Sequence, residues 1–104
     1  MVKSRGYRIE IGDVEHALYE HDDVSEVAVV AIPDEEVGAR LFAAVKIRDG
    51  VSVTENALVI FCRKRLPHYM VPEAIRVLSE LPQTSTGKID RVALRERFGN
   101  NASI

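Results

Sequence analysis

Hydrophobic and polar residues follow one another along this chain with changing periods, and these periods predict the elements of the fold. Ile11, Val14 and Leu18 are spaced as on one face of a helix. Residues 24–32 are rich in β-branched side chains and almost continuously apolar from Val27, as expected of a strand buried on both faces. Residues 41–47 predict a second strand, and residues 74–78 predict a short third one.

Two further helices are indicated by the residues at their ends. Thr54 is a good N-cap for a helix that Pro67 stops, and the apolar stripe of this helix comprises Leu58, Phe61, Cys62 and Leu66. Asp90 is suited to cap a final helix that runs through Phe98, with Gly99 as the residue after its C-terminus.

The beginning of the chain predicts a β-hairpin over residues 2–5 and 7–10. It would turn near Gly6, because glycine permits a positive φ or a close approach of another chain. Hairpin, helix, strand, strand, helix, strand, loop and helix then follow in order. This order predicts an α+β fold, in which the N-terminal hairpin joins a small sheet of about three strands packed with helices. A chain of 104 residues holds one modest core, so we expect a single domain over residues 1–104.

Composition excludes several classes of partner and site. A formal net charge of −2 gives no overall attraction to nucleic acid or to a membrane, so any phosphate binding must be local. Cys62 has no second cysteine to pair with, which favours a reducing cytoplasm and a buried structural thiol over a nucleophile. The sequence has no membrane-spanning stretch and no signal peptide. The three histidines lack metal-ligand spacing, so no metal site is expected.

Two basic motifs carry the candidate chemistry. Residues 3–10 read KSRGYRIE, and residues 81–91 read LPQTSTGKIDR, where Lys88 follows a hydroxyl-rich loop and precedes a helix start. A phosphate-binding P-loop would need a glycine and a hydroxyl residue where this chain has Pro82 and Ile89. Lys88 is therefore not expected to belong to a self-contained nucleotide site.

In this order, and about eighty residues apart, the two motifs resemble the mobile C-terminal domain of the adenylate-forming superfamily. That superfamily contains acyl-CoA synthetases, the adenylation domains of nonribosomal peptide synthetases, and luciferases. The resemblance extends from Val2 to Phe98. It implies a ligase that converts a carboxylate and ATP into an acyl-adenylate and pyrophosphate. The acyl group then passes to the phosphopantetheine thiol of CoA or of a carrier protein.

The resemblance also implies what this chain lacks. ATP with its Mg²⁺, and the acid to be activated, would be held mainly by a large N-terminal domain in cis or in trans. The hinge residue, usually an aspartate or a lysine, would fall just before Met1. We therefore expect either a domain cut at its boundary or a naturally separate half, folded but inactive alone. The first motif looks closer to adenylation domains that load carrier proteins than to short-chain acyl-CoA synthetases.

The second motif would act in the first half-reaction. Both reactants are anions, so the barrier is largely electrostatic and positional. By resemblance, Lys88 would be the catalytic cation, touching the carboxylate and an α-phosphate oxygen together. Thr86 and Gly87 would position its loop.

The first motif would act in the second half-reaction. By resemblance, the hairpin swings in, and Gly6 would line the passage of the pantetheine arm, where a side chain would obstruct it. Arg8 would face the nucleotide phosphates, and Lys3 and Arg5 could meet anions at the rim. Glu15 matches the G-x-[IV]-E pattern of the family, but a helix-dipole role explains it equally well, so we do not assign it to catalysis.

Two alternatives stay open. The same fold could serve as a non-catalytic module that docks a carrier protein, for which Arg63, Lys64 and Arg65 are the candidate contacts. Complementarity to the helix dipole is a simpler account of these three cations. A small regulatory nucleotide-binding domain would require ATP affinity in the isolated chain.

Overall fold

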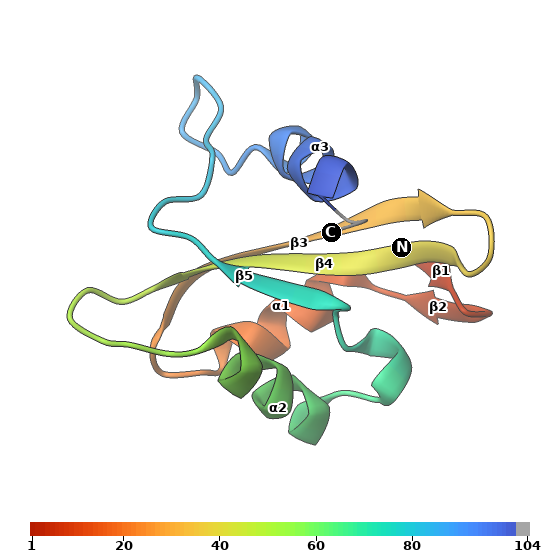
Figure 1. Ribbon diagram of the computed structural model, residues 1–104, viewed down its shortest axis with the longest axis horizontal. Helices are drawn as coiled ribbons and strands as arrows, with labels where there is room; N and C mark the ends of the chain where they lie inside the picture. Colours follow the sequence, from red (N-terminus) through yellow and green to blue (C-terminus); the bar gives the residue numbers. More distant parts are fainter. Residues whose placement is uncertain (102–104) are drawn as a thin grey trace.

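The computed structural model describes residues 1–101 and confirms an α+β architecture (Figure 1). The elements in order are β1 (Val2–Ser4), β2 (Tyr7–Ile9), α1 (Ile11–Tyr19), β3 (Val24–Asp34), β4 (Gly38–Ile47), α2 (Glu55–Arg65), a 3-10 turn η1 (His68–Met70), β5 (Ala74–Val77) and α3 (Arg91–Asn101). The predicted hairpin, three-stranded sheet and three helices are all present within this part of the chain.

The main sheet has the strand order β3-β4-β5. Strands β3 and β4 form an antiparallel pair, whereas β5 runs parallel to β4 after a crossover through α2. Because β4 lies in the centre, β3 and β5 each leave one edge without a strand partner among the described residues. These free edges need other hydrogen-bond partners.

Helices cover both faces of the sheet. Figure 1 shows α1 and α2 below the sheet and α3 above it. Val27 and Val29 of β3 belong to the core between the sheet and helices α1 and α2. Ala28 and Val30 belong to the core between the sheet and α3. Each of these four side chains is at most 1% exposed, so β3 is buried on both faces as its apolar run predicts.

Several boundaries differ from the predicted ones; β1, β2 and β5 each end one residue earlier. Strand β3 continues through Pro33 to Asp34, because proline is tolerated on an edge strand, and β4 already begins at Gly38. Helix α3 continues through Gly99 to Asn101, so Gly99 is not the residue after the helix. The ring of Phe98 stacks on that of Phe42 at 5.1 Å, and this packing holds the last turn on the sheet.

The predicted helix caps and the buried thiol are confirmed. Ala57 N–H donates to Thr54 Oγ1 at 3.0 Å, and Ala93 N–H donates to Asp90 Oδ1 at 3.0 Å. Cys62 is fully buried, and burial raises the pKa of its thiol to about 11. Among residues 1–101, no helix has both the length and the apolarity needed to cross a bilayer.

Candidate functional site

The N-terminal hairpin turns through two residues with left-handed backbone. Arg5 has φ +55° and Gly6 has φ +84°, the combination that a tight two-residue hairpin turn requires. A Cβ placed on Gly6 would meet no atom of the described chain within 4 Å. The backbone conformation therefore accounts for this glycine inside the domain, and its role in a pantetheine passage stays a prediction.

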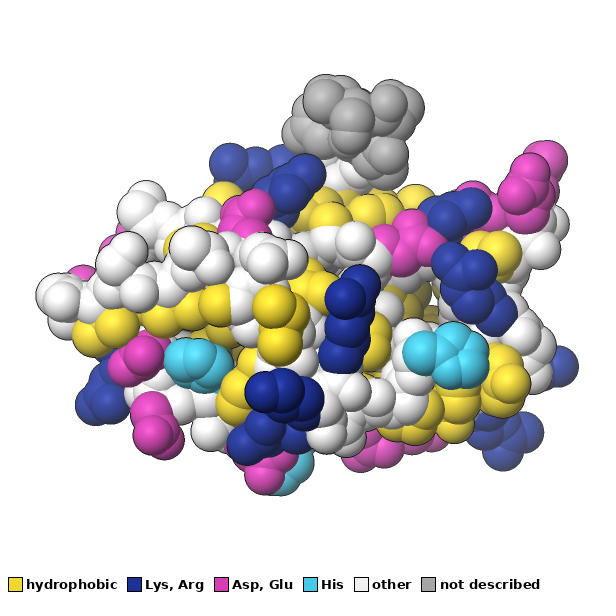
Figure 2. Space-filling model, turned by 60° about the horizontal axis from the view of Figure 1, so that its bottom comes forward, with side chains coloured by type: hydrophobic (Ala, Val, Ile, Leu, Met, Phe, Trp, Pro, Cys, Tyr) yellow, Lys and Arg dark blue, Asp and Glu magenta, His cyan; other side chains and the backbone are white. Residues whose placement is uncertain are grey.

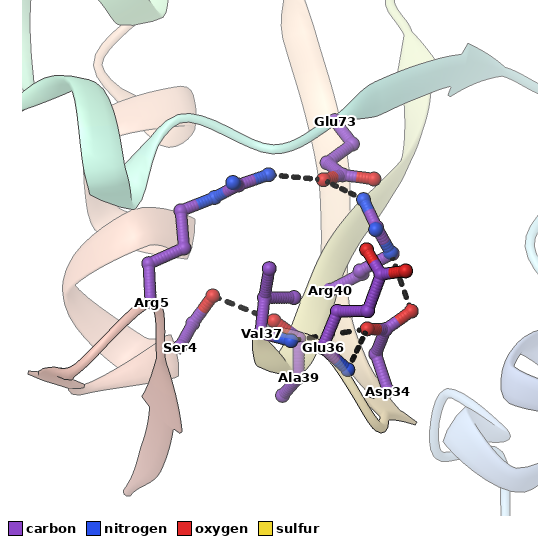
Figure 3. A network of polar contacts seen from close by, with 8 residues as sticks. All are labelled: Ser4, Arg5, Asp34, Glu36, Val37, Ala39, Arg40 and Glu73. Atoms are coloured by element: carbon purple, nitrogen blue, oxygen red, sulfur yellow. Dashed lines mark hydrogen bonds and ion pairs between the residues drawn. The ribbon is translucent and has the colours of Figure 1, made fainter.

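The hairpin is attached to the body of the domain (Figure 3). Ser4 is buried, and its hydroxyl donates to the Ala39 carbonyl at 2.6 Å. Arg5 N–H donates to the Val37 carbonyl at 2.7 Å. These bonds join the hairpin tip to the start of β4, so we expect the hairpin to move together with the whole domain rather than swing alone.

Charged side chains extend this attachment. Arg5 Nη2 and Arg40 Nη1 both lie 2.7 Å from Glu73 Oε1, and Arg40 Nε lies 2.7 Å from Asp34 Oδ2. The Arg40 guanidinium lowers the pKa of Asp34 below its ordinary 3.8, with help from the backbone N–H groups of Val37 and Glu36. Arg5 is thus engaged with a carboxylate, which weakens its candidacy as a free cation at the rim.

Lys3 and Arg8 behave differently from Arg5. They are direct partners in the β1–β2 ladder, and both are exposed. Neither makes an ion pair or a side-chain hydrogen bond with any residue in the described part of the chain. Like charges directly opposite each other on a hairpin repel, so this arrangement does not serve the stability of the hairpin. It creates a local positive edge in an otherwise acidic chain.

An aromatic contact secures the other side of the hairpin. Tyr7 stacks on Tyr69 with ring centroids 3.8 Å apart and planes 5° from parallel, and His68 contacts both rings edge-on. Tyr69 and Glu73 also line a depression of about 300 Å³ next to the hairpin. The sequence does not reveal this contact, because the two tyrosines lie far apart along the chain.

The loop that carries Lys88 is closed by its own hydrogen bonds. Thr84 N–H donates to the Lys88 carbonyl at 2.7 Å, and Gly87 N–H donates to the Thr84 carbonyl at 3.0 Å. The Thr84 and Thr86 hydroxyls lie 3.0 Å apart, and Gly87 has φ +85°. Thr86 and Gly87 therefore shape the turn that presents the lysine. The loop is an ordered turn rather than a loose hydroxyl-rich segment.

The Lys88 side chain is exposed at the base of this loop. Within residues 1–101, its ammonium group has no ion-pair or hydrogen-bond partner. Figure 1 shows the loop projecting from the sheet at the end opposite the β1–β2 hairpin. The two motifs that the sequence singled out are therefore not brought together in one site.

The basic residues at the end of α2, which the sequence offered as candidate contacts for a carrier protein, do not all have free charges. Arg65 lies over the Phe61 ring at 3.8 Å and 3.7 Å from Glu20, whereas Arg63 and Lys64 are exposed. Figure 2 looks toward the side of the molecule that carries α2 and shows basic side chains interspersed with apolar and acidic ones. This face has no single large positive patch.

Glu15 has a role that sequence reasoning missed. It is the fifth residue of α1, beyond the first turn, and its Oε2 accepts a hydrogen bond from Val29 N–H at 2.8 Å. The same oxygen forms an ion pair with Arg91 Nη2. Glu15 therefore serves the free edge of β3 and the start of α3, two roles that the helix-dipole explanation does not include.

Metal-ligating residues do not gather in the described chain. Among residues 1–101, no group of three or more histidine, cysteine, aspartate or glutamate side chains could hold a metal ion.

Comparison with known proteins assigns these features to a family. The profile described as the AMP-binding enzyme C-terminal domain matches residues 13–88, which end at the candidate lysine. The chain belongs to this family. It is 43% identical over 98 residues to a probable CoA ligase of Humulus lupulus, covering 92% of this chain and 17% of that protein. Bacitracin synthase 3 of Bacillus licheniformis is 46% identical over 96 residues, covering 91% of this chain and 2% of that protein.

Solved structures agree with this assignment. An acyl-CoA synthetase from Brucella canis has 36% identity and a TM-score of 0.82, covering 98% of this chain and 20% of that one. An amide bond synthetase from Marinactinospora thermotolerans has 34% identity and a TM-score of 0.83, covering 93% of this chain and 20% of that one. This AMP-binding enzyme C-terminal domain thus spans a fifth or less of these relatives.

Proposed function

We propose that this domain is the mobile catalytic lid of an ATP-dependent acid–thiol ligase. It would work with a large N-terminal domain, in cis or in trans, that holds ATP, Mg²⁺ and the acid. The length of the relatives supports this division, since the chain covers only 17% of the probable CoA ligase. A buried thiol and a single cysteine fit a reducing cytoplasm.

The proposal rests on the ammonium group of Lys88, which is exposed and has no partner within residues 1–101. A carboxylate and an α-phosphate repel each other, and a compact cation between them would lower the barrier to attack. Arg5 and Arg40 are less suited to this catalytic role, because both form ion pairs with Glu73. The other cations lie outside the loop. The hydrogen-bonded turn holds the backbone of Lys88 in place, so the side chain reaches out from a fixed base.

The separation of the two motifs supports a reaction in two steps. The loop that carries Lys88 and the β1–β2 hairpin lie at opposite ends of the domain (Figure 1), so both would not enter one cleft in the same orientation. The lid would present Lys88 during adenylate formation. It would then turn to present the hairpin, with Gly6 and Arg8 facing the pantetheine passage and the nucleotide phosphates.

We further propose a phosphopantetheine thiol, of CoA or of a carrier protein, as the acyl acceptor. The names of the relatives include CoA ligases and a bacitracin synthase, and one structural relative is named an amide bond synthetase. The positive edge of the hairpin, which has no acidic partner among the described residues, favours an acceptor that carries phosphate, which a simple amine lacks.

The test compares the half-reactions in the complete enzyme. Lys88→Ala should slow adenylate formation, followed as ATP–pyrophosphate exchange, by roughly 10²-fold, as for loss of a preorganised charge. Transfer from a supplied acyl-adenylate to the thiol should be unchanged. An equal loss in both half-reactions would contradict the role of Lys88.

Arg63→Ala serves as the matched control, because this cation is exposed but lies on α2. It should leave adenylate formation unchanged. The alternative function, a non-catalytic docking module for a carrier protein, predicts the reverse pattern. In that case Lys88→Ala would be silent and Arg63→Ala would abolish binding of the carrier protein.

A further inference from the structure

We propose that Glu15 and Arg91 form a positioning pair that fixes the direction in which Lys88 leaves the domain. This inference rests on the proposed function, because it assigns to the pair a part in adenylate formation. The pair joins residues 76 positions apart in the sequence and connects α1 with the first residue of α3.

The Glu15 end of the pair is firmly held. Its side chain is 16% exposed, and one carboxylate oxygen accepts both Val29 N–H, at 2.8 Å, and the Arg91 guanidinium. Val29 lies on β3, whose free edge has no strand partner among the described residues, so this carboxylate stands where a neighbouring strand would accept a hydrogen bond. Tyr19, one turn further along α1, serves the same edge by accepting Val27 N–H at 3.1 Å.

At the Arg91 end, only Ile89 and Asp90 separate the arginine from Lys88 along the backbone. Asp90 caps the helix that Arg91 begins, and Asp90 N–H donates to the Pro82 carbonyl at 2.8 Å. Gln83 and Ile89 then pair across the base of the loop as an isolated bridge. Any tilt of the first turn of α3 would therefore be passed to the loop and to Lys88.

The geometry also explains why a charged pair is present. Helices α1 and α3 lie on opposite faces of the sheet (Figure 1). The pair connects them at the free edge of β3, where Glu15 also accepts the Val29 N–H. Val29 N–H needs only an oxygen acceptor, which a neutral amide would supply equally well. The carboxylate and the guanidinium add a directional link to α3 that edge protection alone does not require.

The experiment uses the complete enzyme and separates the half-reactions. Arg91→Ala should lower the rate of adenylate formation at saturating substrate by roughly 10- to 100-fold, as expected when a reacting group is misplaced by about 1 Å. Transfer from a supplied acyl-adenylate should be unchanged. Arg91→Lys keeps a charge within reach and should recover part of the rate.

Two variants make the test specific. Glu15→Gln keeps the oxygen that accepts Val29 N–H but removes the charge, and it should reproduce the effect of Arg91→Ala. The double variant should be no slower than either single one, because both remove the same contact. Arg95→Ala, an exposed cation one turn further along α3, should leave the adenylation rate unchanged.

The outcomes distinguish this inference from the proposed function. If Lys88→Ala does not slow adenylate formation, the proposed function is wrong, and the positioning role is wrong with it. If Lys88→Ala slows that step but Arg91→Ala does not, only the positioning pair is refuted. It is also refuted if Arg91→Ala lowers the melting temperature and slows both half-reactions equally, since the pair would then serve stability alone.

Discussion

Lys3 and Arg8 face each other across the two strands of the N-terminal hairpin, and neither has an acidic partner in the described part of the chain. Two cations directly opposite each other repel, and this repulsion lowers the stability of the hairpin. Sequence reasoning named both residues as candidate anion contacts. The register adds that they form one positive edge and not two separate charges.

Removing either cation should therefore slow thiol transfer without lowering the stability of the domain. Lys3→Ala and Arg8→Ala should leave the free energy of unfolding unchanged or raise it by about 0.2–1 kcal/mol, because a repulsion is lost. Both should slow thiol transfer in the complete enzyme. Arg5→Ala is the contrasting variant, since it breaks the ion pair with Glu73 and should lower the melting temperature. If Lys3→Ala and Arg8→Ala lower the melting temperature as Arg5→Ala does, the edge is structural.

Gly6 and Gly12 provide a matched pair for testing the turn. A Cβ would meet nothing within 4 Å at either position, but only Gly6 has a positive φ. Gly6→Ala should lower the free energy of unfolding by about 1–2 kcal/mol, the cost of a left-handed residue. Gly12→Ala, inside α1, should raise it by up to about 1 kcal/mol.

Gly6→Asn then tests the proposed passage for the pantetheine arm. Asparagine tolerates the left-handed conformation, so the stability of the chain should be largely preserved. The added side chain should still slow thiol transfer without affecting adenylate formation. A variant with unchanged transfer would show that the glycine serves the turn and nothing else.

Acid should weaken the attachment of the hairpin. The folded form lowers the pKa of Asp34 below 3.8, mainly through the hydrogen bond from Arg40, so the folded chain holds this proton more weakly than the unfolded chain. The resulting stability is fully present above the ordinary pKa and is lost as the pH falls through the lower folded value. Melting temperatures recorded between about pH 6 and pH 2 should fall more steeply for the natural chain than for Asp34→Asn. Parallel curves would contradict this assignment.

Cys62 should be unreactive in the folded chain. Burial raises its thiol pKa from the ordinary 9.0 to about 11, so very little thiolate is present at neutral pH. A disulfide reagent should label the thiol rapidly only after denaturation. Since the fold favours the protonated thiol, its contribution to stability is complete below pH 9.0 and is lost as the pH rises toward 11. Equal labelling rates for folded and denatured chain would refute the buried state.

The sequence by itself determined the elements and the two motifs. The run from Val27 to Val30 predicts a strand buried on both faces, and Thr54 and Asp90 mark helix starts, because these signals are local and depend on side-chain period and capping. Lys88 stands out only when its loop is taken together with the first motif and the family that the two motifs resemble. Strand ends were less predictable, since the pairing of Asp34 with Gly38 extends β3 and β4 past Pro33.

Only the tertiary structure decided which cations are free. Arg5 and Lys88 look alike in sequence, yet Arg5 meets Glu73, 68 residues further along the chain, whereas Lys88 meets no partner in the described chain. The Glu15–Arg91 pair was hidden for the same reason, as it depends on two helices meeting around one sheet edge. Such long-range contacts arise from the packing of elements against each other, which short-range periodicity does not encode.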